Sequence, residues 1–291
     1  MDYVKPDQVM HDMIEAGAAK ARLKNSQMLT RGMLSGAILA CATTLAFTAS
    51  TQTNIPMAGA LLFPVGFIII ILLGLELVTG SFALLPLAVL QKKASTASML
   101  ANYGWVILGH MIGCLIYGGL YALTATKMGT DMSHPMVRMI IEASETKTLG
   151  YKELGMSGML LVWIKAMLCN WMVTLGVVMA FTSSSTLGKI VAMWLPILLF
   201  FGQGFEHAVV NMFVIPAGMM LGANVSMTDW WFWNQIPVLI GNFIGGSVFT
   251  GAMLYFAQYG FGKRRGVTRM ATGYSGRRVM EATAVPVEKR R

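Results

Sequence analysis

The sequence predicts an all-α membrane protein with six transmembrane helices, built as two halves of three helices that form an inverted repeat. Hydrophobic residues make up 55% of the chain and charged residues only 12%, far from the average of soluble domains. Several apolar runs are long enough to cross a bilayer. Two of these runs also share one pattern at a constant offset, a glycine before an acidic residue and a proline after it: Gly74, Glu76 and Pro86 in one run, Gly204, Glu206 and Pro216 in the other.

Residues 1–27 precede the first apolar run and are expected to form an amphipathic helix on the cytoplasmic side of the membrane. The segment carries lysines with acidic residues between them, so it does not resemble a cleavable leader. Val9, Met10, Met13 and Ile14 follow helical spacing and would form a short apolar face. Two interpretations remain open here: a solvated leader, or a helix that packs against the rest of the chain.

Residues 28–260 are expected to form the membrane domain. Six hydrophobic blocks lie within it, and the longest connection between them is 127–155. The blocks are 28–51, 58–90, 99–126, 157–182, 190–221 and 230–259.

The second and fifth blocks are too long for ordinary membrane-spanning helices. Block 58–90 as one straight helix would be about 50 Å long, against a hydrocarbon core of about 30 Å. A strong tilt could absorb part of the excess, but the glycine beside a buried acid and the later proline favour a break in each helix. Non-helical backbone at membrane depth is tolerated where it lines a cavity or is enclosed by protein. Both breaks are therefore expected on a central pathway.

The similarity between the halves extends to the other blocks. Arg31-Gly32-Met33-Leu34 in the first block resembles Lys165-Ala166-Met167-Leu168 in the fourth. Halves with three spans each must enter from opposite sides of the membrane, which makes the repeat inverted. Broken helices at matching positions of such a repeat are the best sequence pointer to a transport site. Glycine pairs also match between the third and sixth blocks: Gly109 and Gly113 with Gly241 and Gly245.

Basic residues are concentrated on the side that holds both chain ends and the Lys92-Lys93 turn. We therefore expect both termini to be cytoplasmic, in a plasma (inner) membrane. Much of the net charge of +9 lies in 261–291, which we expect to be a basic cytoplasmic tail that contacts anionic lipids. A nucleic-acid partner is not indicated, because no stacking aromatics or folded module accompany the tail.

His207 and two acidic residues are the candidate functional groups at membrane depth, where ionisable side chains are costly and tend to mark a pathway. A functional role is favoured for His207 because it lies on the fifth-block break. Glu76 and Glu206 are expected to support the breaks by accepting hydrogen bonds from freed backbone N–H groups or by biasing a half-helix N-terminus. Glu206 and His207 are adjacent and should diverge, so no metal site is expected. His110, in the third block, lacks this context and is assigned no role.

Polar and aromatic residues near the breaks are candidates for the path itself. Lys165 lies inside the fourth block and could either snorkel outward as an anchor or draw anions into an outer vestibule. Thr79, Asn170 and Asn211 could line the path or tie helices together. Aromatic residues that precede the breaks serve either as packing or as hydrophobic constrictions. They are Phe63, Phe67, Phe200, Phe201 and Phe205.

Roughly residues 5–260 resemble the formate/nitrite transporter family, and three motifs carry this resemblance most specifically. The resemblance implies an aquaporin-like protomer with its own central pore, assembled as a homopentamer. It also implies transport of a small monovalent anion of a weak acid, with formate or nitrite as the leading candidates. The motifs are Lys165-Ala166-Met167-Leu168-Cys169-Asn170-Trp171, Gly204-Phe205-Glu206-His207 with Asn211-Met212, and Glu76-Leu77-Val78-Thr79-Gly80.

The same resemblance implies roles for individual residues. His207 corresponds to a central pore histidine, Thr79 to the loop that breaks the second helix, and Lys165 to a vestibule lysine, with Asn170 later in the same motif. Members commonly carry phenylalanine where this chain has Val78, so the inner constriction is expected to be wider or built by another residue. The constriction positions are Phe200 and the Leu77-Val78 pair.

The expected mechanism is proton-coupled anion transport. Lys165 would attract the anion, and apolar constrictions would exclude it while it is charged. A neutral His207 could accept or relay a proton. Half-helix N-termini would add positive potential. The alternative is a passive channel for hydrosulfide, lactate or a neutral solute, with His207 as the gate. Neither an enzyme nor a cofactor is expected, because the chain shows no nucleophile elbow, cofactor motif or clustered metal ligands.

Overall fold

The computed structural model describes residues 2–260, and this part of the chain is built from helices, as predicted. The predicted tail 261–291 lies outside the described residues. The helices are α1 (Pro6–Lys20), α2 (Asn25–Thr53), α3 (Pro56–Leu62), α4 (Pro64–Leu72), α5 (Val78–Leu90), α6 (Thr96–Ala125), α7 (Pro135–Thr146), α8 (Leu149–Glu153), α9 (Met156–Phe181), α10 (Thr186–Gly202), α11 (Ala208–Met220), α12 (Met227–Trp230), η1 (Trp231–Gln235), α13 (Ile236–Ile244), η2 (Gly245–Ala252) and α14 (Met253–Tyr259).

Four continuous helices in residues 2–260 are long and apolar enough to cross a membrane. They correspond to the first, third, fourth and sixth predicted blocks. The last of them runs without interruption from α12 to α14, although η1 and η2 within it are π-helical. Their bounds are Asn25–Thr53, Thr96–Ala125, Met156–Phe181 and Met227–Tyr259.

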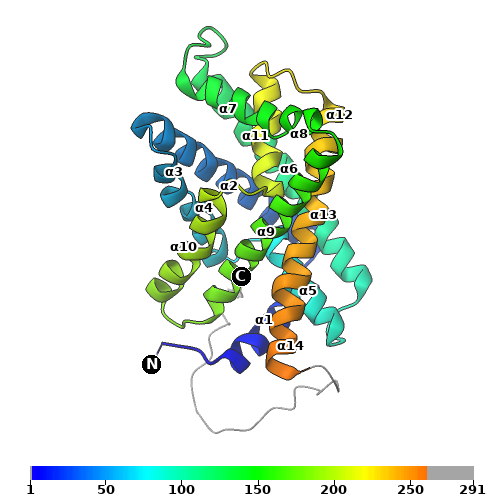
Figure 1. The fold of residues 1–291 in the computed structure, drawn as a ribbon. Coiled ribbons are helices and arrows are strands. Elements are labelled where there is room, and N and C mark those ends of the chain that lie inside the picture. The colour runs from blue at the N-terminus through cyan, green and yellow to red at the C-terminus, as the bar shows by residue number, and fades with distance from the viewer. Residues whose placement is uncertain (1, 261–291) are drawn as a thin grey trace, which may run out of the picture.

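The second and fifth blocks are broken, as predicted. In the second, α4 ends at Leu72 and α5 begins at Val78; in the fifth, the break runs from the end of α10 to the start of α11. Gly74 has φ +64° and Gly204 has φ +65°, a left-handed conformation that glycine adopts without a Cβ penalty. The two glycines thus turn the chain at equivalent places, and Figure 1 shows the shorter helices packed among the long ones.

The second block has one further interruption, between α3 and α4 at Phe63, which the sequence pattern did not predict. Pro64 is the first residue of α4, a position where the missing N–H of proline is tolerated. The helix therefore restarts rather than continuing through the proline.

Small residues let the helices of each half approach closely. A Cβ at Gly113 of α6 would lie 2.0 Å from the carbonyl oxygen of Met33 in α2. At the matching position in η2, a Cβ at Gly245 would lie 2.2 Å from the carbonyl oxygen of Met167 in α9. Neither contact tolerates a side chain, which explains why the glycines recur in both halves.

The helix α1 packs against the rest of the molecule, which decides between the two interpretations of the N-terminal segment. Its predicted apolar face is buried, with Met13 0% and Ile14 1% exposed. The residues before it pair with the loop after α9, where the N–H of Val4 donates to the carbonyl of Thr182 at 2.9 Å. In Figure 1, α1 and α14 lie at the lower end of the molecule, whereas α7 and α8 lie at the upper end.

Candidate functional site

The first break is held by a buried cluster around Glu76, whose side chain is 3% exposed. Lys20, at the end of α1, places its Nζ 2.8 Å from Glu76 Oε1. Asn102 of α6 donates from Nδ2 to the other carboxylate oxygen at 3.4 Å. The acid is therefore paired with a cation from one end of the molecule and an amide from the third predicted block.

The second break is held in the same way, with more partners. Lys147, just after α7, places its Nζ 2.9 Å from Glu206 Oε2. Tyr151 donates its hydroxyl to Glu206 Oε1 at 2.8 Å, and Asn211 donates its amide to Oε2 at 2.8 Å. Asn234 completes the set with its Nδ2 3.4 Å from Oε2.

The two clusters therefore use one set of residue types, a lysine, a glutamate and an asparagine, in corresponding elements of each half. The lysines come from segments at opposite ends of the molecule, α1 and the α7–α8 region (Figure 1). A buried carboxylate is tolerated when it is paired and its lone pairs are satisfied. Both buried carboxylates are thus paired with a cation, as a charge away from water requires.

Between the breaks, the side chains of His207 and Thr79 meet. His207 Nε2 lies 3.0 Å from Thr79 Oγ1, and both residues are buried. His207 Nδ1 accepts the backbone N–H of Val210 at 3.3 Å, so Nδ1 carries no proton and a neutral ring carries it on Nε2. The imidazole then donates to the Thr79 hydroxyl, and that hydroxyl is free to donate onward.

Aromatic rings flank the imidazole on one side. The ring of Phe200 stacks on His207 with centroids 5.6 Å apart and an interplanar angle of 25°. Phe63 contacts Phe200 edge-on at 5.6 Å and stacks on Phe201 at 4.0 Å. Phe67, Leu77 and Val78 are also buried in the core, at 2%, 2% and 0% exposure. Phe200 therefore lies against His207 with Phe63 beside it, whereas burial alone does not place Phe67 at a break.

The structure separates the remaining predicted path residues. Asn170 of α9 donates to the carbonyl of Thr79 at 3.1 Å, while its own Oδ1 is buried without a partner among residues 2–260. Asn211 belongs instead to the Glu206 cluster, because its amide also donates to Asn234 Oδ1 at 2.8 Å. Lys165 is half-buried, and its Nζ lies 5.9 Å from the centroid of the Tyr151 ring. Asn170 is therefore beside the Thr79–His207 contact, and Lys165 is near the second cluster.

The glutamates support the breaks through other groups than expected. Their carboxylates contact lysine, tyrosine and asparagine side chains rather than the freed backbone N–H groups. Those N–H groups are satisfied from the third span of each half: His110 Nε2 accepts from Val78 at 3.1 Å, and Asn242 Oδ1 accepts from Ala208 at 2.9 Å. As expected, Glu206 and His207 point to different partners.

The sequence analysis did not predict several residues that contact the breaks. Four of them could have been found from their matching positions in the repeat. Asn102 and Asn234 occupy corresponding places in the third and sixth blocks, as do His110 and Asn242, which stand between the matched glycine pairs. Polar residues at matching positions of a repeat indicate shared contacts more strongly than either residue alone.

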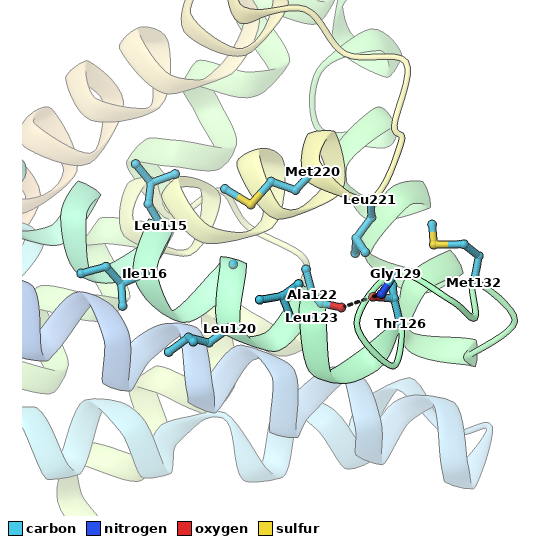
Figure 2. A pocket seen from close by; sticks show the side chains of 11 residues that line it. Leu115, Ile116, Leu120, Ala122, Leu123, Thr126, Gly129, Met132, Met220 and Leu221 are labelled. Atoms are coloured by element: carbon cyan, nitrogen blue, oxygen red, sulfur yellow. Dashed lines mark hydrogen bonds between the residues drawn. The ribbon is translucent and has the colours of Figure 1, made fainter.

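A groove of about 570 Å³ lies elsewhere, on the outer side of α6 and α11. Figure 2 shows that apolar side chains line it, among them Leu120, Leu123 and Met220. None of its lining residues is a break residue, so the groove is not part of the site described above.

The family model described as formate/nitrite transporter matches residues 7–256. The chain is 36% identical over 275 residues to the uncharacterized transporter YrhG of Bacillus subtilis (strain 168), covering 89% of this chain and 95% of the relative. It is 32% identical over 269 residues to the formate channel BtFdhC of Bacillus thuringiensis, covering 89% of this chain and 97% of the relative.

Solved structures show the same architecture. An FNT family ion channel superposes with a TM-score of 0.72 at 25% sequence identity, covering 86% of this chain and 99% of that one. A pentameric formate channel with formate bound superposes with a TM-score of 0.66 at 24% identity, covering 81% of this chain and 97% of that one. The arrangement of helices described above is therefore that of a known channel fold.

Proposed function

Because the chain belongs to the formate/nitrite transporter family, we propose that it carries a small monovalent anion of a weak acid across a membrane, with formate or nitrite as the leading candidates. The relatives include a formate channel that the chain matches over nearly its full length. The substrate passes between the two helix breaks, and the protein has a transport rather than a catalytic role.

The observation that carries this proposal is the contact between Thr79 and His207. Thr79 lies in the first turn of α5, and His207 is the N-cap of α11, so their contact brings two half-helix N-termini together. A helix N-terminus carries partial positive charge and attracts anions. Two such ends facing one point favour an anion there without placing a full cation in the membrane interior.

Different groups beside the Thr79–His207 contact attract the anion and exclude hydrated charges. Lys165 lies near the second cluster and draws anions toward the break. The ring of Phe200 against His207 and the buried Leu77 and Val78 oppose a fully hydrated charge. An anion that gains a proton at this point crosses the apolar stretch as its neutral acid, which removes the cost of desolvating a charge.

The contacts of His207 support a route for that proton. A proton taken up at His207 Nδ1 displaces the N–H of Val210 and makes an imidazolium. The Nε2 proton then passes to the Thr79 oxygen while the Thr79 hydroxyl proton passes to the anion. The ring is left neutral with its proton on Nδ1, the hydroxyl is restored, and the anion has become a neutral acid.

The substitution His207→Asn tests the relay. Asparagine is a good N-cap and can still accept the N–H of Val210, so the start of α11 is kept, but the side chain does not titrate. Formate uptake into proteoliposomes should fall, and its remaining rate should no longer change between about pH 5 and 8. Thr79→Ser should keep most of the uptake and Thr79→Val should lose it. An unchanged pH profile in the asparagine variant would remove the relay.

A passive channel is the alternative, with His207 acting as a gate. The stacking of Phe200 on the imidazole is the observation that favours it, because ring rotation would open or close the passage. A pH-sensitive dye inside the vesicles separates the two functions. Proton-coupled uptake changes the internal pH in step with the anion, whereas flux of a bare anion does not.

A further inference from the structure

Two residues occupy matching positions beside the two breaks and have different chemistry. His110 stands in Gly109-His110-Met111-Ile112-Gly113, and Asn242 stands in Gly241-Asn242-Phe243-Ile244-Gly245. Both side chains are 0% exposed. Each accepts the backbone N–H of the first residue in the half-helix of its own half.

Asn242 makes three hydrogen bonds with one amide. Its Oδ1 accepts from the N–H of Ala208 at 2.9 Å, and its Nδ2 donates to the carbonyls of Ala166 at 2.8 Å and Glu206 at 2.9 Å. An amide has one oxygen acceptor and two N–H donors, so both donors are in use. Asn242 thereby ties α9, the break and α11 together.

His110 has fewer donors to give. Its Nε2 accepts from the N–H of Val78 at 3.1 Å, and its Nδ1 lies 2.9 Å from the carbonyl oxygen of Gly32, which can only accept. The neutral ring therefore carries its proton on Nδ1 and has no second N–H. It cannot donate to the carbonyl of Glu76 as Asn242 donates to that of Glu206.

Ser35 provides the missing donor. Its Oγ lies within hydrogen-bond distance of the Glu76 carbonyl and 3.2 Å from His110 Nδ1. The carbonyls of Arg31 and Gly32 are also in range, at 2.9 and 3.0 Å, but the Glu76 contact is the shortest. Cys169, which is buried, occupies the matching place in the second half.

We infer that His110 and Ser35 are positioning residues that together hold the first break in the way Asn242 alone holds the second. Because Val78 directly precedes Thr79, the bond to His110 fixes the start of α5 and with it the hydroxyl that contacts His207. The activity readout of this inference rests on the proposed transport function.

The two caps respond differently to pH. A protonated imidazole donates at both nitrogens and cannot accept the N–H of Val78, whereas an amide does not titrate. Protonation therefore removes the cap that His110 places on Val78, whereas the cap that Asn242 places on Ala208 does not depend on pH. Lys20 of α1 and His207 of the second break act electrostatically with His110, and Cys114 lies one turn along its own helix. Glu76 and Arg31 lie farther off, Glu76 through its carbonyl on Ser35 and Arg31 through its side chain on the carbonyl of Gly74.

Substitutions at His110 test the cap directly. His110→Asn should keep formate uptake into proteoliposomes within about twofold of the parent. The amide can accept the N–H of Val78 and donate to the carbonyl of Gly32, as the histidine does. His110→Leu should lower uptake about tenfold, because Val78 loses its acceptor. Ser35→Ala should slow uptake in the parent protein. In the His110→Asn background it should have little effect, because the second N–H of the new amide then donates to the carbonyl of Glu76.

The second half supplies a matched control. Asn242→His should be poorly tolerated, because Cys169 is a weak donor where the first half has a hydroxyl. Adding Cys169→Ser to Asn242→His should restore part of the uptake. Equal effects of Ser35→Ala in the parent and the His110→Asn background would overturn the shared role.

Hydrogen exchange gives a readout that does not need transport. The amide of Val78 should exchange faster in His110→Leu than in the parent, measured relative to the amide of Ala208 in the same sample. At low pH this ratio should rise in the parent but not in His110→Asn. If His110→Asn exchanges like His110→Leu, His110 is not the cap. If the Val78 amide exchanges faster in His110→Leu as expected but the parent protein transports no anion, the proposed transport function is wrong and the role of His110 as the cap of α5 is still supported.

Discussion

At the scale of single residues, the pairing of Lys147 with Glu206 decides whether the second break can exist in an apolar core. The carboxylate is 3% exposed and accepts bonds from three kinds of side chain. Removing the cation would leave a buried charge with neutral donors alone. The energetics of this site therefore depend more on keeping the pair complete than on the strength of any one bond.

Lys147→Met is expected to lower the free energy of unfolding by about 3 kcal/mol. Lys152 offers a matched control, because it pairs with Asp229 at 2.8 Å but is itself 52% exposed. Lys152→Met should cost less than about 1 kcal/mol. Thermal unfolding of the purified protein in detergent measures both, and Glu206→Gln added to Lys147→Met should recover most of the loss. Equal costs at the two lysines would contradict the prediction.

Sequence reasoning identified the acids and His207 because ionisable residues are rare inside apolar runs. Their lysine partners could not be predicted from local pattern, since Lys20 and Lys147 lie in segments outside the spans and meet the acids only through the fold. The role of His110 could not be predicted either, because it lies in an unbroken helix and reaches the first break only through the fold.

At the scale of elements, the two breaks depend on a left-handed glycine each. A Cβ at Gly204 would meet nothing within 4 Å, so the site has room for a side chain and the constraint lies in the backbone, at φ +65°. This conformation costs a residue with a Cβ about 1–2 kcal/mol.

Gly204→Ala should therefore destabilise the protein by about 1–2 kcal/mol. Gly104 is the control, because a Cβ there also meets nothing within 4 Å but the residue lies inside the helix α6. Gly104→Ala should be neutral or stabilising by up to about 1 kcal/mol. Chemical denaturation in mixed micelles compares the two; identical effects would mean that space rather than backbone conformation sets the cost.

The length of the two runs together with their shared glycine, acid and proline pattern was sufficient to predict the broken elements, because length alone also allows a strongly tilted helix. They did not predict the restart at Pro64 or the π-helical turns η1 and η2. A π-helical turn shifts the register by a fraction of a turn, which leaves the apolar character of the span unchanged and so leaves no mark in a hydrophobicity pattern.

At the scale of the whole molecule, large apolar side chains cover the outside of long and short helices alike. Leu120 is 62% exposed, Leu195 60% and Ile116 53%. In water such a surface would aggregate, whereas lipid chains or neighbouring protomers cover it without cost. The outer surface therefore fits a multi-pass protein with a membrane around it and copies of itself beside it.

We expect the protein to assemble as a homopentamer, as the resemblance of its motifs to the formate/nitrite transporter family implies. Native mass spectrometry from detergent should give a single species of five protomers, each of 31.6 kDa. Because every protomer contains its own Thr79–His207 contact, mixed pentamers with the His207→Asn variant should lose pH-dependent uptake in proportion to the variant's share. Monomers, or loss of function on incorporation of a single variant copy, would contradict this.

The polar contacts that hold the breaks have a consequence for biosynthesis. Lys20, Glu76 and Asn102 all precede the α6–α7 connection, and Lys147, Glu206 and Asn234 all follow it. While the ribosome is still making the second half, the first can already satisfy its buried charge in the translocon or the bilayer. The contact between Thr79 and His207 crosses the halves and forms only when both are complete. A stalled or truncated chain would therefore have a paired Glu76 but no contact between Thr79 and His207.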